Sequence, residues 1–407
     1  MDTPSETNCG RGLLEGIRIV DFSRVLAGPY CSALLGDLGA EVIKVEPPQG
    51  DDQRQMGVIR EGESVNFALL NRGKKSVCLD LKTPEGLDAA RRLAATADAV
   101  IENFRPGVAA RLGISYDDLR QVKPDLIYCS ISGFGQEGPL SKRPSYDVIA
   151  QAMSGMMSIT GAVDGPPMLV GDAIADVSAG MFAAFGIAIA LFHRERSGEG
   201  QYLDVAMLDS LLTMMPTALA RYQGLGEAPG RSGNRHPLTE PFGAYTAKDG
   251  QFIVAAANNS LFARLCGAIG RPEWVTDPRF ASVQSRTANR AVLAAGLEGW
   301  AAERTVEEVV EALLAAKVPS SPIWDLAVAA ESAHCGARGV FRPLAHDVFG
   351  GLRAPEQPVH FAGWPRGIPT RAPARGADTE AVLGNLPRMD PDRIARLSRC
   401  KVDEDPA

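Results

Sequence analysis

Two carboxylates stand immediately before a long apolar stretch of the chain. Asp172 and Asp176 lie four residues apart, and no charged residue occurs between Val177 and Phe192. The small residues in this stretch and the basic turn before Gly198 predict a buried helix that ends there. Aspartate often caps a helix by accepting a backbone N–H. The alternative is a carboxylate that the helix dipole keeps ionised in a poorly hydrated pocket, where it attacks an electrophile.

Basic side chains gather next to two predicted strands. Arg72, Lys74 and Lys75 precede one strand, Arg105 follows another, and Arg111 ends the short helix after it. Such clusters are often solvated surface charge. Guanidinium and ammonium groups also suit phosphate oxygens, and open α/β sheets bind ligands at the carboxyl ends of their strands. This second interpretation predicts an anionic, nucleotide-like ligand.

The turn after the first predicted strand argues against a dinucleotide cofactor. The turn reads DFSRVLAGP and lacks the G-x-G-x-x-G pattern, while Gly36 and Gly39 fall at the far end of the following helix. Without glycines at the helix N-terminus, a pyrophosphate cannot approach the backbone closely. We therefore expect neither NAD nor FAD.

A glycine-rich loop leads from a later strand to two further candidate residues. Gly133 and Gly135 begin this loop, and Tyr146 and Asp147 open the apolar helix after it. We interpret Asp147 as a cap or as a partner of a backbone amide. Tyr146 either lines a pocket or belongs to the core.

The elements that would position these residues alternate between strands and helices. Between residues 13 and about 200, β-rich runs alternate with helical spacing, which predicts an open, doubly wound parallel α/β sheet of the Rossmann-like kind. A Gly/Pro-rich segment over 224–243 precedes a hairpin, with Asp249-Gly250 at its turn, and two or three helices. We predict a large α/β domain over 13–224, a small α+β domain over 225–325, and a return segment over 326–407 that completes the large domain.

Bulk composition describes a globular chain and excludes several classes. The chain has 407 residues, 45% hydrophobic and 22% charged, and its net charge of −7 argues against a nucleic-acid partner. Seven scattered cysteines and five isolated histidines predict reduced thiols and no metal site. The first residues lack the apolar core of a signal peptide, and no apolar run reaches the roughly 18 residues of a membrane span. We expect a cytoplasmic protein without a membrane partner.

Five sequence blocks together resemble the family III CoA-transferases, also called the CaiB/BaiF family. This group includes formyl-CoA transferase, carnitine CoA-transferase and α-methylacyl-CoA racemase. The blocks are VDFSRVLAGP, GAEVIKVEPP, LNRGKKSVCLDLKTPEG, ENFRPGVAARLG and SGEGQYLDVAML. The resemblance covers nearly the whole chain, and the combination of blocks is highly specific. It implies acyl-CoA and a carboxylic acid as substrates, CoA as a substrate and not a resident cofactor, and an interlocked homodimer.

The resemblance also assigns roles to individual positions. The nucleophilic aspartate of the family matches Asp176 in GDAIADVSAG, and Asp172 then becomes a loop residue. The implied reaction moves CoA to a free acid through covalent aspartyl intermediates. Contacts with CoA are implied for Val25, Leu26, Leu70, Asn71, Arg72, Lys74, Asn103, Phe104, Arg105, Arg111, Arg143, Tyr146 and Asp147.

Departures from related patterns bear on the substrate. Leu26 and Pro47 stand where formyl-CoA transferase has a glutamine and an arginine, which argues against formate and oxalate. The racemase branch has a histidine at the position of Tyr146, and a tyrosine is a poor base near neutral pH. Transferase is therefore favoured, with a racemase or epimerase and an acyl-CoA-binding protein with an inactive site as alternatives.

The Gly/Pro-rich segment supplies candidates for the acceptor acid. It contains Arg231, Arg235 and His236, which favour binding of a second carboxylate. A dicarboxylic acceptor is therefore expected, and the segment around 230–243 is a candidate lid. A loop histidine is also often simply exposed.

Overall fold

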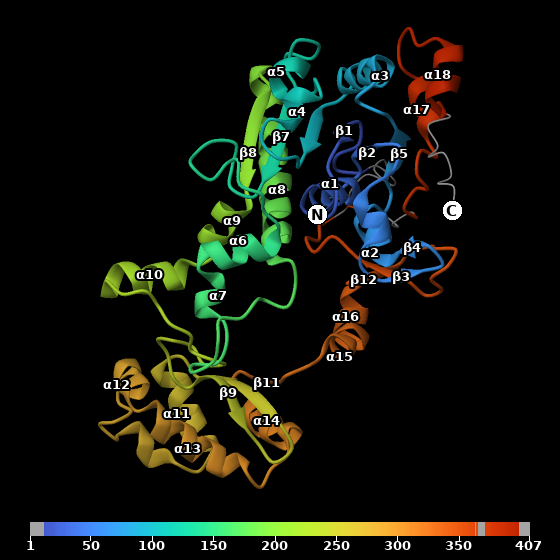
Figure 1. Ribbon diagram of the computed structural model, residues 1–407. Helices are drawn as coiled ribbons and strands as arrows, with labels where there is room; N and C mark the ends of the chain where they lie inside the picture. Colours follow the sequence, from blue (N-terminus) through green and yellow to red (C-terminus); the bar gives the residue numbers. More distant parts are fainter. Residues whose placement is uncertain (1–11, 363, 365–370, 399–407) are drawn as a thin grey trace, which may run out of the picture. The chain divides into compact units, whose positions relative to one another are not determined.

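The computed structural model describes residues 12–362, 364 and 371–398. The chain forms two compact units (Figure 1). Within the described residues, the first unit comprises the parts of Met1–Met156, Leu169–Thr217 and His334–Ala407, and the second comprises Met157–Met168 and Ala218–Ala333. The segment 157–168 therefore departs from the predicted boundaries. It joins the small unit because Arg231 donates to the carbonyls of Ser158 and Ala162.

A six-stranded parallel sheet forms the centre of the first unit. Its strand order is β5-β2-β1-β6-β7-β8, so the predicted α/β architecture with a parallel sheet is confirmed. The chain runs outward from β1 to β5 and then returns to β6, on the other side of β1. Open α/β sheets bind ligands at such a reversal. The strands are β1 (Arg18–Asp21), β2 (Glu41–Glu46), β5 (Lys75–Cys78), β6 (Ala99–Glu102), β7 (Ile127–Ser132) and β8 (Gln201–Ala206).

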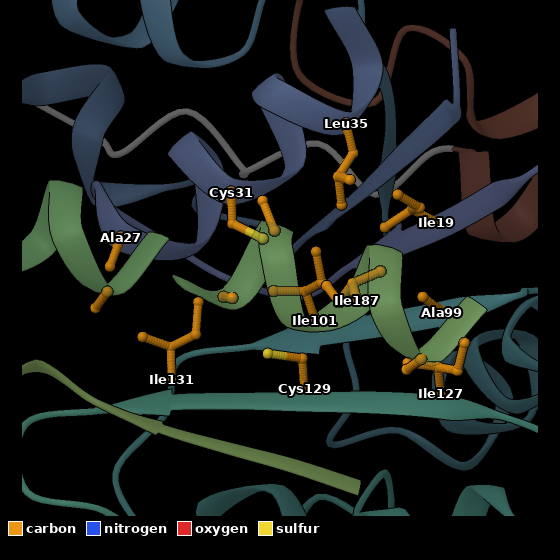
Figure 2. Close-up of a cluster of buried hydrophobic side chains, with 14 of the residues drawn as sticks. Ile19, Ala27, Cys31, Leu35, Ala99, Ile101, Ile127, Cys129, Ile131 and Ile187 are labelled. Atoms are coloured by element: carbon orange, nitrogen blue, oxygen red, sulfur yellow. The ribbon is translucent and has the colours of Figure 1, made fainter. Parts of the chain in front are cut away.

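Alternate strand residues enter two separate cores, one on each face of the sheet. Ile19 and Ile101 pack with helices α1 and α8 (Figure 2), whereas their neighbours Val20 and Val100 pack with α3 on the opposite face. Period-two alternation with both faces apolar is the pattern of a parallel sheet covered by helices. The covering helices are α1 (Ala27–Asp37), α3 (Pro84–Ala94), α4 (Val108–Arg111), α5 (Tyr116–Leu119), α6 (Asp147–Ser154), α8 (Ile174–Ser197) and α9 (Met207–Thr213).

The C-terminal part of the chain packs back on the first unit. Leu344 and Ala354 lie against Ala68, and the hydroxyl of Thr379 accepts the N–H of Cys78. The remaining elements here are η2 (Asp52–Gln55), β3 (Ile59–Arg60), β4 (Glu63–Ser64), α2 (Val65–Leu70), β12 (Phe341–Pro343), β13 (Arg353–Pro355), α17 (Thr379–Gly384) and α18 (Pro391–Ser398). Helices α7 (Met156–Ile159), α10 (Pro216–Leu225) and α16 (Ala333–Arg338) cross the boundaries between the units.

The second unit has its own antiparallel sheet and core. The predicted hairpin is confirmed, because β9 and β10 pair and the N–H of Ala247 donates to the carbonyl of Gly250 across the turn. Four α-helices occur in the described region 259–315, where two or three were predicted. The elements are β9 (Phe242–Thr246), β10 (Gln251–Ala255), α11 (Asn259–Ala268), η3 (Pro272–Val275), α12 (Val283–Ala288), α13 (Arg290–Ala301), α14 (Val306–Ala315), β11 (Ser320–Pro322) and α15 (Leu326–Glu331).

Helix α8 is longer and more apolar than expected from the sequence. Its 24 residues reach a mean hydropathy of 1.9, so by length and composition this helix could cross a membrane, which corrects the expectation that no run is long enough. Ala179, Ala183 and Ile187 are fully buried against α1 and the sheet. A core helix of an α/β domain can have the same composition, and here one face of α8 packs on apolar partners while the opposite face is exposed.

Close packing of α8 on α1 depends on Gly180. A Cβ at this position would lie 2.6 Å from the carbonyl oxygen of Ala27, whereas a Cβ at Gly186 would meet only the side chain of Leu203 at 2.6 Å. We expect Gly180→Ala to lower the free energy of unfolding by about 1–3 kcal/mol, because backbone cannot move aside. Gly186→Ala is the matched control and should have a smaller effect, since Leu203 can change rotamer. Equal effects in urea denaturation would contradict the packing argument.

Candidate active site

Asp176 lies in the first turn of α8, as its third residue. Ala173 occupies the N-cap position, and no side chain of the cap residue bonds there, so the capping interpretation is wrong for both aspartates. Asp172 is exposed in the preceding bend, where its Oδ1 accepts the N–H of Ala173 (2.7 Å). The loop position expected for Asp172 is therefore confirmed, and Asp176 is the carboxylate at the helix terminus.

A second carboxylate, from α6, occupies the end of α8. Oδ1 of Asp147 accepts the N–H of Ala175 at 2.7 Å, which confirms the predicted partnership with a backbone amide. The buried amide of Gln151 supports this arrangement, because it donates to Oδ2 of Asp147 (2.7 Å) and accepts the N–H of Val170 (2.9 Å). The first turn of α6 is thereby joined to the start of α8, and Asp147 is placed beside Asp176.

The environment of Asp176 changes its acidity. Burial raises the pKa of Asp176 to about 7, and the negative charge of Asp147 acts in the same direction. The sequence predicted a carboxylate kept ionised by the helix dipole. The structure corrects this, because loss of hydration and a neighbouring anion both disfavour the charged form. A carboxyl group with this pKa is partly protonated and partly ionised near neutral pH, as is typical of functional sites.

This pKa predicts the pH dependence of the first chemical step. The carboxylate is the reactive form, so kcat/KM for the acyl-CoA donor should rise between about pH 6 and 8. Asp147→Asn removes the negative charge that faces Asp176 from α6, and the midpoint should move to lower pH. Stopped-flow or initial-rate measurements over this range test both points. A wild-type midpoint near pH 4, or an unchanged midpoint in the variant, would contradict the assignment.

Contact between α8 and α1 brings Asp176 near the reversal point of the sheet. Gly180, one turn after Asp176, approaches the carbonyl of Ala27, the first residue of α1. The rise of a helix is about 1.5 Å per residue, so the four residues from Asp176 to Gly180 place Asp176 about 6 Å from this contact along the helix axis. Residues 22–26 immediately precede Ala27 and connect it to β1. Asp176 and the turn at the carboxyl end of β1 therefore belong to one region of the first unit.

Hydrogen bonds tie the loop after β1 (residues 22–26) to the loop after β6 (residues 103–107) at the reversal point. The N–H of Arg24 donates to Oδ1 of Asn103 (2.8 Å), and Nδ2 of Asn103 donates to the carbonyl of Arg24 (2.7 Å). The Arg24 guanidinium lies 5.9 Å from the ring of Phe104 and pairs with Asp52 (3.2 Å). Arg24 was not identified from the sequence, although its position directly after the first strand could have indicated it.

Several known proteins are similar to this chain in sequence and in architecture. The profile of CoA-transferase family III matches residues 14–379. The chain belongs to CoA-transferase family III. It is 42% identical over 356 residues to an acetyl-CoA:oxalate CoA-transferase of Acetobacter aceti, covering 87% of this chain and 90% of that protein. It is 40% identical to a succinate–glutarate CoA-transferase of Agrobacterium fabrum, covering 93% and 96%.

A solved structure agrees with these sequence matches. A CaiB/BaiF family protein from Brucella suis superimposes with a TM-score of 0.81 at 36% identity, covering 92% of this chain and all of that one. The resemblance inferred from the sequence blocks is confirmed. This family III protein is a CoA-transferase, an enzyme that moves CoA from an acyl-CoA thioester to a carboxylic acid. CoA thioesters are its substrates.

The basic side chains predicted to clamp phosphate, Arg72, Lys74 and Lys75, form ion pairs with carboxylates of this domain. The Arg72 guanidinium bonds to the Asp37 carboxylate, Lys74 is buried against Asp21 (3.1 Å), and Lys75 pairs with Glu41 (2.6 Å). The three cations therefore already have carboxylate partners, and their contact with phosphate stays a prediction. Asn71 is likewise buried, and its Oδ1 accepts from Lys74. Contact between CoA and Leu70, Asn71, Arg72 and Lys74 remains a prediction.

Other expected CoA contacts lie at the surface or at the reversal point. Val25, Leu26, Asn103 and Phe104 belong to the two tied loops and are partly exposed. Tyr146 is the N-cap residue of α6 and is 66% exposed, so it is not a core residue. The exposed cations among the expected contacts are Arg105, Arg111 and Arg143.

The candidates for binding the acceptor acid lie in the second unit, and one of them is engaged there. The Arg235 guanidinium stacks 3.5 Å from the centre of the Tyr245 ring and faces Glu240 and Glu298 at 3.8 and 3.5 Å. Its charge is thus shared with internal carboxylates, which argues against a primary role in binding the acid. His236 accepts the N–H of Leu238 through Nδ1 (3.2 Å).

Cysteine, histidine and acidic side chains do not gather around one point in the part of the chain that the structure describes. No group of three or more His, Cys, Asp or Glu side chains among those residues could hold a metal ion. Cys31, Cys129 and Cys266 are buried free thiols, and burial raises the pKa of each of them. Cys9 and Cys400 lie outside the described residues.

Proposed function

We propose that Asp176 is the nucleophile of this CoA-transferase and that the CoA thioester binds over the tied loops at residues 22–26 and 103–107. One observation carries the proposal: the poorly hydrated carboxylate of Asp176 stands at a helix N-terminus, one turn from the contact between α8 and the first residue of α1. Backbone N–H groups at that terminus are suited to a developing oxyanion. Arg24 and Arg105, from the two loops, are candidates for the phosphates of CoA.

The proposed reaction proceeds through covalent intermediates. The Asp176 carboxylate attacks the thioester carbonyl, which gives a mixed anhydride and releases CoA thiolate. The thiolate attacks the aspartyl carbonyl, which forms an aspartyl-CoA thioester and releases the donor acid. The acceptor carboxylate then displaces the thiolate to form a second anhydride, and the thiolate finally attacks the acceptor carbonyl, which restores Asp176. Each step exchanges one acyl bond for another, which divides a difficult transfer into easier ones.

We propose dicarboxylic acids as acceptors. The relatives are named for oxalate and for succinate and glutarate, and the second unit carries Arg231 in the segment predicted to bind a second carboxylate. Oxalate, which Leu26 and Pro47 disfavoured, belongs in the panel because of the 42% identity to the oxalate enzyme. Mass spectrometry of acetyl-CoA or succinyl-CoA mixed with single acids would show which new thioester forms. Exclusive use of monocarboxylic acids would contradict this part of the proposal.

Trapping the intermediate tests the nucleophile directly. The enzyme is mixed with succinyl-CoA without an acceptor, reduced with borohydride, digested and sequenced by mass spectrometry. We expect modification at Asp176 and none at Asp172 or Asp147. Modification confined to any peptide without residue 176 would overturn the proposal. The same enzyme in deuterated water should leave the α-carbon of a branched acyl-CoA unlabelled, whereas a racemase would introduce deuterium there.

We also propose that the enzyme works as a homodimer, as the sequence resemblance implied. Along one face of α8, Met181, Phe185, Ile189 and Phe192 are each at least half exposed, and a contiguous apolar patch on a soluble protein commonly marks an interface. A second copy of the chain is the expected partner.

Negative charges introduced on this face of α8 should prevent two copies of the chain from associating. We expect wild-type protein to elute as a dimer in light-scattering chromatography and Phe185→Glu/Ile189→Glu to elute as a monomer, because a buried, unpaired carboxylate opposes association. Glu195→Gln, on the polar last turn, is the control and should remain dimeric. A wild-type monomer at micromolar concentration would contradict the proposal.

A further inference from the structure

Val25 has a backbone conformation that a β-branched residue rarely adopts. Its φ is +64°, in the left-handed region. A side chain branched at Cβ is disfavoured there, and such strain persists only where surrounding contacts hold it. Val25 lies in the turn between β1 and α1, at the reversal point of the sheet. Backbone strain observed at a ligand-binding turn points to a functional constraint.

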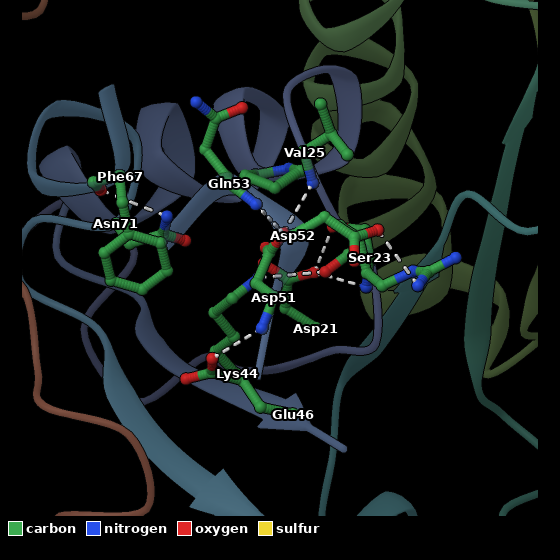
Figure 3. Close-up of polar contacts among 12 residues, drawn as sticks. Asp21, Ser23, Val25, Lys44, Glu46, Asp51, Asp52, Gln53, Phe67 and Asn71 are labelled. Carbon is green, nitrogen blue, oxygen red and sulfur yellow. Dashed lines mark hydrogen bonds and ion pairs between the residues drawn. The ribbon is translucent and has the colours of Figure 1, made fainter. Parts of the chain in front are cut away.

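A buried network holds three consecutive residues of this turn (Figure 3). Oδ1 of Asp51 accepts the N–H of Val25 at 3.0 Å. Asn103 bonds both backbone groups of Arg24, and Nζ of Lys44 donates to the carbonyl of Ser23 (2.9 Å). The turn therefore has few backbone alternatives, because each of these residues is fixed from a different element.

Asp51 is placed so that it cannot easily move. Its side chain is almost fully buried, its Oδ1 also accepts the N–H of Gln53 (2.9 Å), and its Oδ2 pairs with Lys44 at 2.7 Å. Its own N–H donates to Glu46 (3.1 Å). An ion pair with a fully buried lysine and two bonds to backbone amides make this carboxylate a rigid acceptor. A water molecule in its place would not fix the Val25 N–H to the same degree.

We propose that Asp51 is a positioning residue, which holds Val25 in the left-handed conformation so that the turn at residues 22–26 is pre-organised to receive CoA. This inference rests on the proposed CoA site and adds a residue that does not itself touch the ligand. Without Asp51, the chain relaxes to an ordinary conformation at Val25, and binding has to restore the strained one. Pre-organisation of this kind appears as affinity for the ligand.

A double-substitution cycle separates this role from simple support of the fold. The dissociation constant of CoA is measured by isothermal titration, beside KM for succinyl-CoA. Asp51→Ala should weaken CoA binding about tenfold, as expected when strain of this kind must be restored on binding. In the Val25→Gly background the same change should weaken binding less than about threefold, because glycine adopts positive φ without strain. An undiminished loss in that background would overturn the proposal.

Matched controls address the charge of Asp51 and general destabilisation. Asp51→Asn keeps an oxygen acceptor for Val25 but loses the charge that faces Lys44, so it should weaken CoA binding less than Asp51→Ala does. Asp98→Asn is the matched control for destabilisation. Like Asp51, Asp98 accepts a backbone N–H and pairs with a cation, here Arg194, but it lies at the amino ends of the strands. This variant should lower the melting temperature without changing CoA affinity. If Asp98→Asn weakens CoA binding as much as Asp51→Ala, the effect is general and the proposal fails.

Two variants keep the test decisive if Asp51→Ala does not fold. Proline fixes φ near −65°, so Val25→Pro cannot adopt the observed conformation and should weaken binding more than Val25→Gly does. Equal CoA affinity for both would overturn the proposal. Leu26→Trp separates this outcome from failure of the proposed CoA site. A normal affinity in this variant would place CoA elsewhere, whereas a lowered affinity with no effect at Val25 would contradict only the role of Asp51.

Discussion

Asp176→Asn is expected to lower kcat for CoA transfer by at least about 10⁴-fold, because removal of a covalent nucleophile leaves only the contributions of binding and of oxyanion stabilisation. Asparagine preserves the shape of the side chain but cannot form the mixed anhydride. Affinity for CoA should change little, since the turn at residues 22–26 is untouched. The measurement is initial-rate kinetics with succinyl-CoA and glutarate, together with titration of CoA.

Stability should move in the opposite direction to activity. Burial and the charge of Asp147 raise the pKa of Asp176, so at pH 8 the folded state carries an unfavourable carboxylate that the unfolded state solvates freely. Asp176→Asn should therefore melt at the same or a higher temperature, as when a strained active-site group is removed. Asp172→Asn, in the exposed bend, is the control and should keep wild-type turnover. An inactive Asp172→Asn beside an active Asp176→Asn would invert the assignment.

Local pattern was sufficient to predict most strands of the parallel sheet and several of the helices that cover it. Strands such as Glu41–Glu46 carry apolar residues on both faces, and Thr83 caps α3 by accepting the N–H of Gly86, as its place before Pro84 indicates. These features depend on residues within one turn or one strand. The number of helices in the second unit was underestimated because short helices separated by tight turns leave little periodicity to read.

Contacts between distant parts of the chain could not be derived in this way. Lys74 reads as a surface cation beside a strand, yet it is buried against Asp21, 53 residues earlier. Asp147 reads as a cap or as a partner of a backbone amide, but local pattern does not show that this amide belongs to Ala175 of α8, 28 residues later. Each pairing depends on the tertiary packing, which brings elements together that the sequence separates. The raised pKa of Asp176 has the same origin, since it requires both burial and the approach of α6.

Asp21→Asn is expected to destabilise the first unit by about 3–5 kcal/mol, the usual consequence of removing one partner from a buried ion pair. Asp21 ends β1 with no exposure, and its Oδ2 meets Nζ of Lys74 at 3.1 Å and the hydroxyl of Ser32 at 2.5 Å. Burial alone would raise the pKa of Asp21, but Lys74, Lys44 and two serine hydroxyls outweigh it and lower the pKa to about 2. Chemical denaturation of the variant and wild type measures the difference.

Removing the charges of both Asp21 and Lys74 should restore most of the stability that Asp21→Asn loses. Asp21→Asn/Lys74→Met replaces the pair by neutral groups and should recover the greater part of the stability, since no unpaired ion is then buried. Glu41→Gln, which breaks the half-exposed pair with Lys75, is the control and should change stability by less than about 1 kcal/mol. Equal losses for the buried and the exposed pair would contradict the importance of burial.

The direction in which each pKa is shifted predicts how the stability of these variants depends on pH. The pKa of Asp21 is lowered, so its contribution to stability is complete above about pH 4 and is lost as the pH falls towards 2. Burial lowers the pKa of Lys74 to about 8 despite the attraction of Asp21, and without that attraction the pKa should fall further. The deficit of Asp21→Asn should therefore be smaller at pH 9 than at pH 6, because Lys74 can then remain folded as the neutral amine. A deficit independent of pH would show that the lost hydrogen bonds, and not the buried charge, determine the effect.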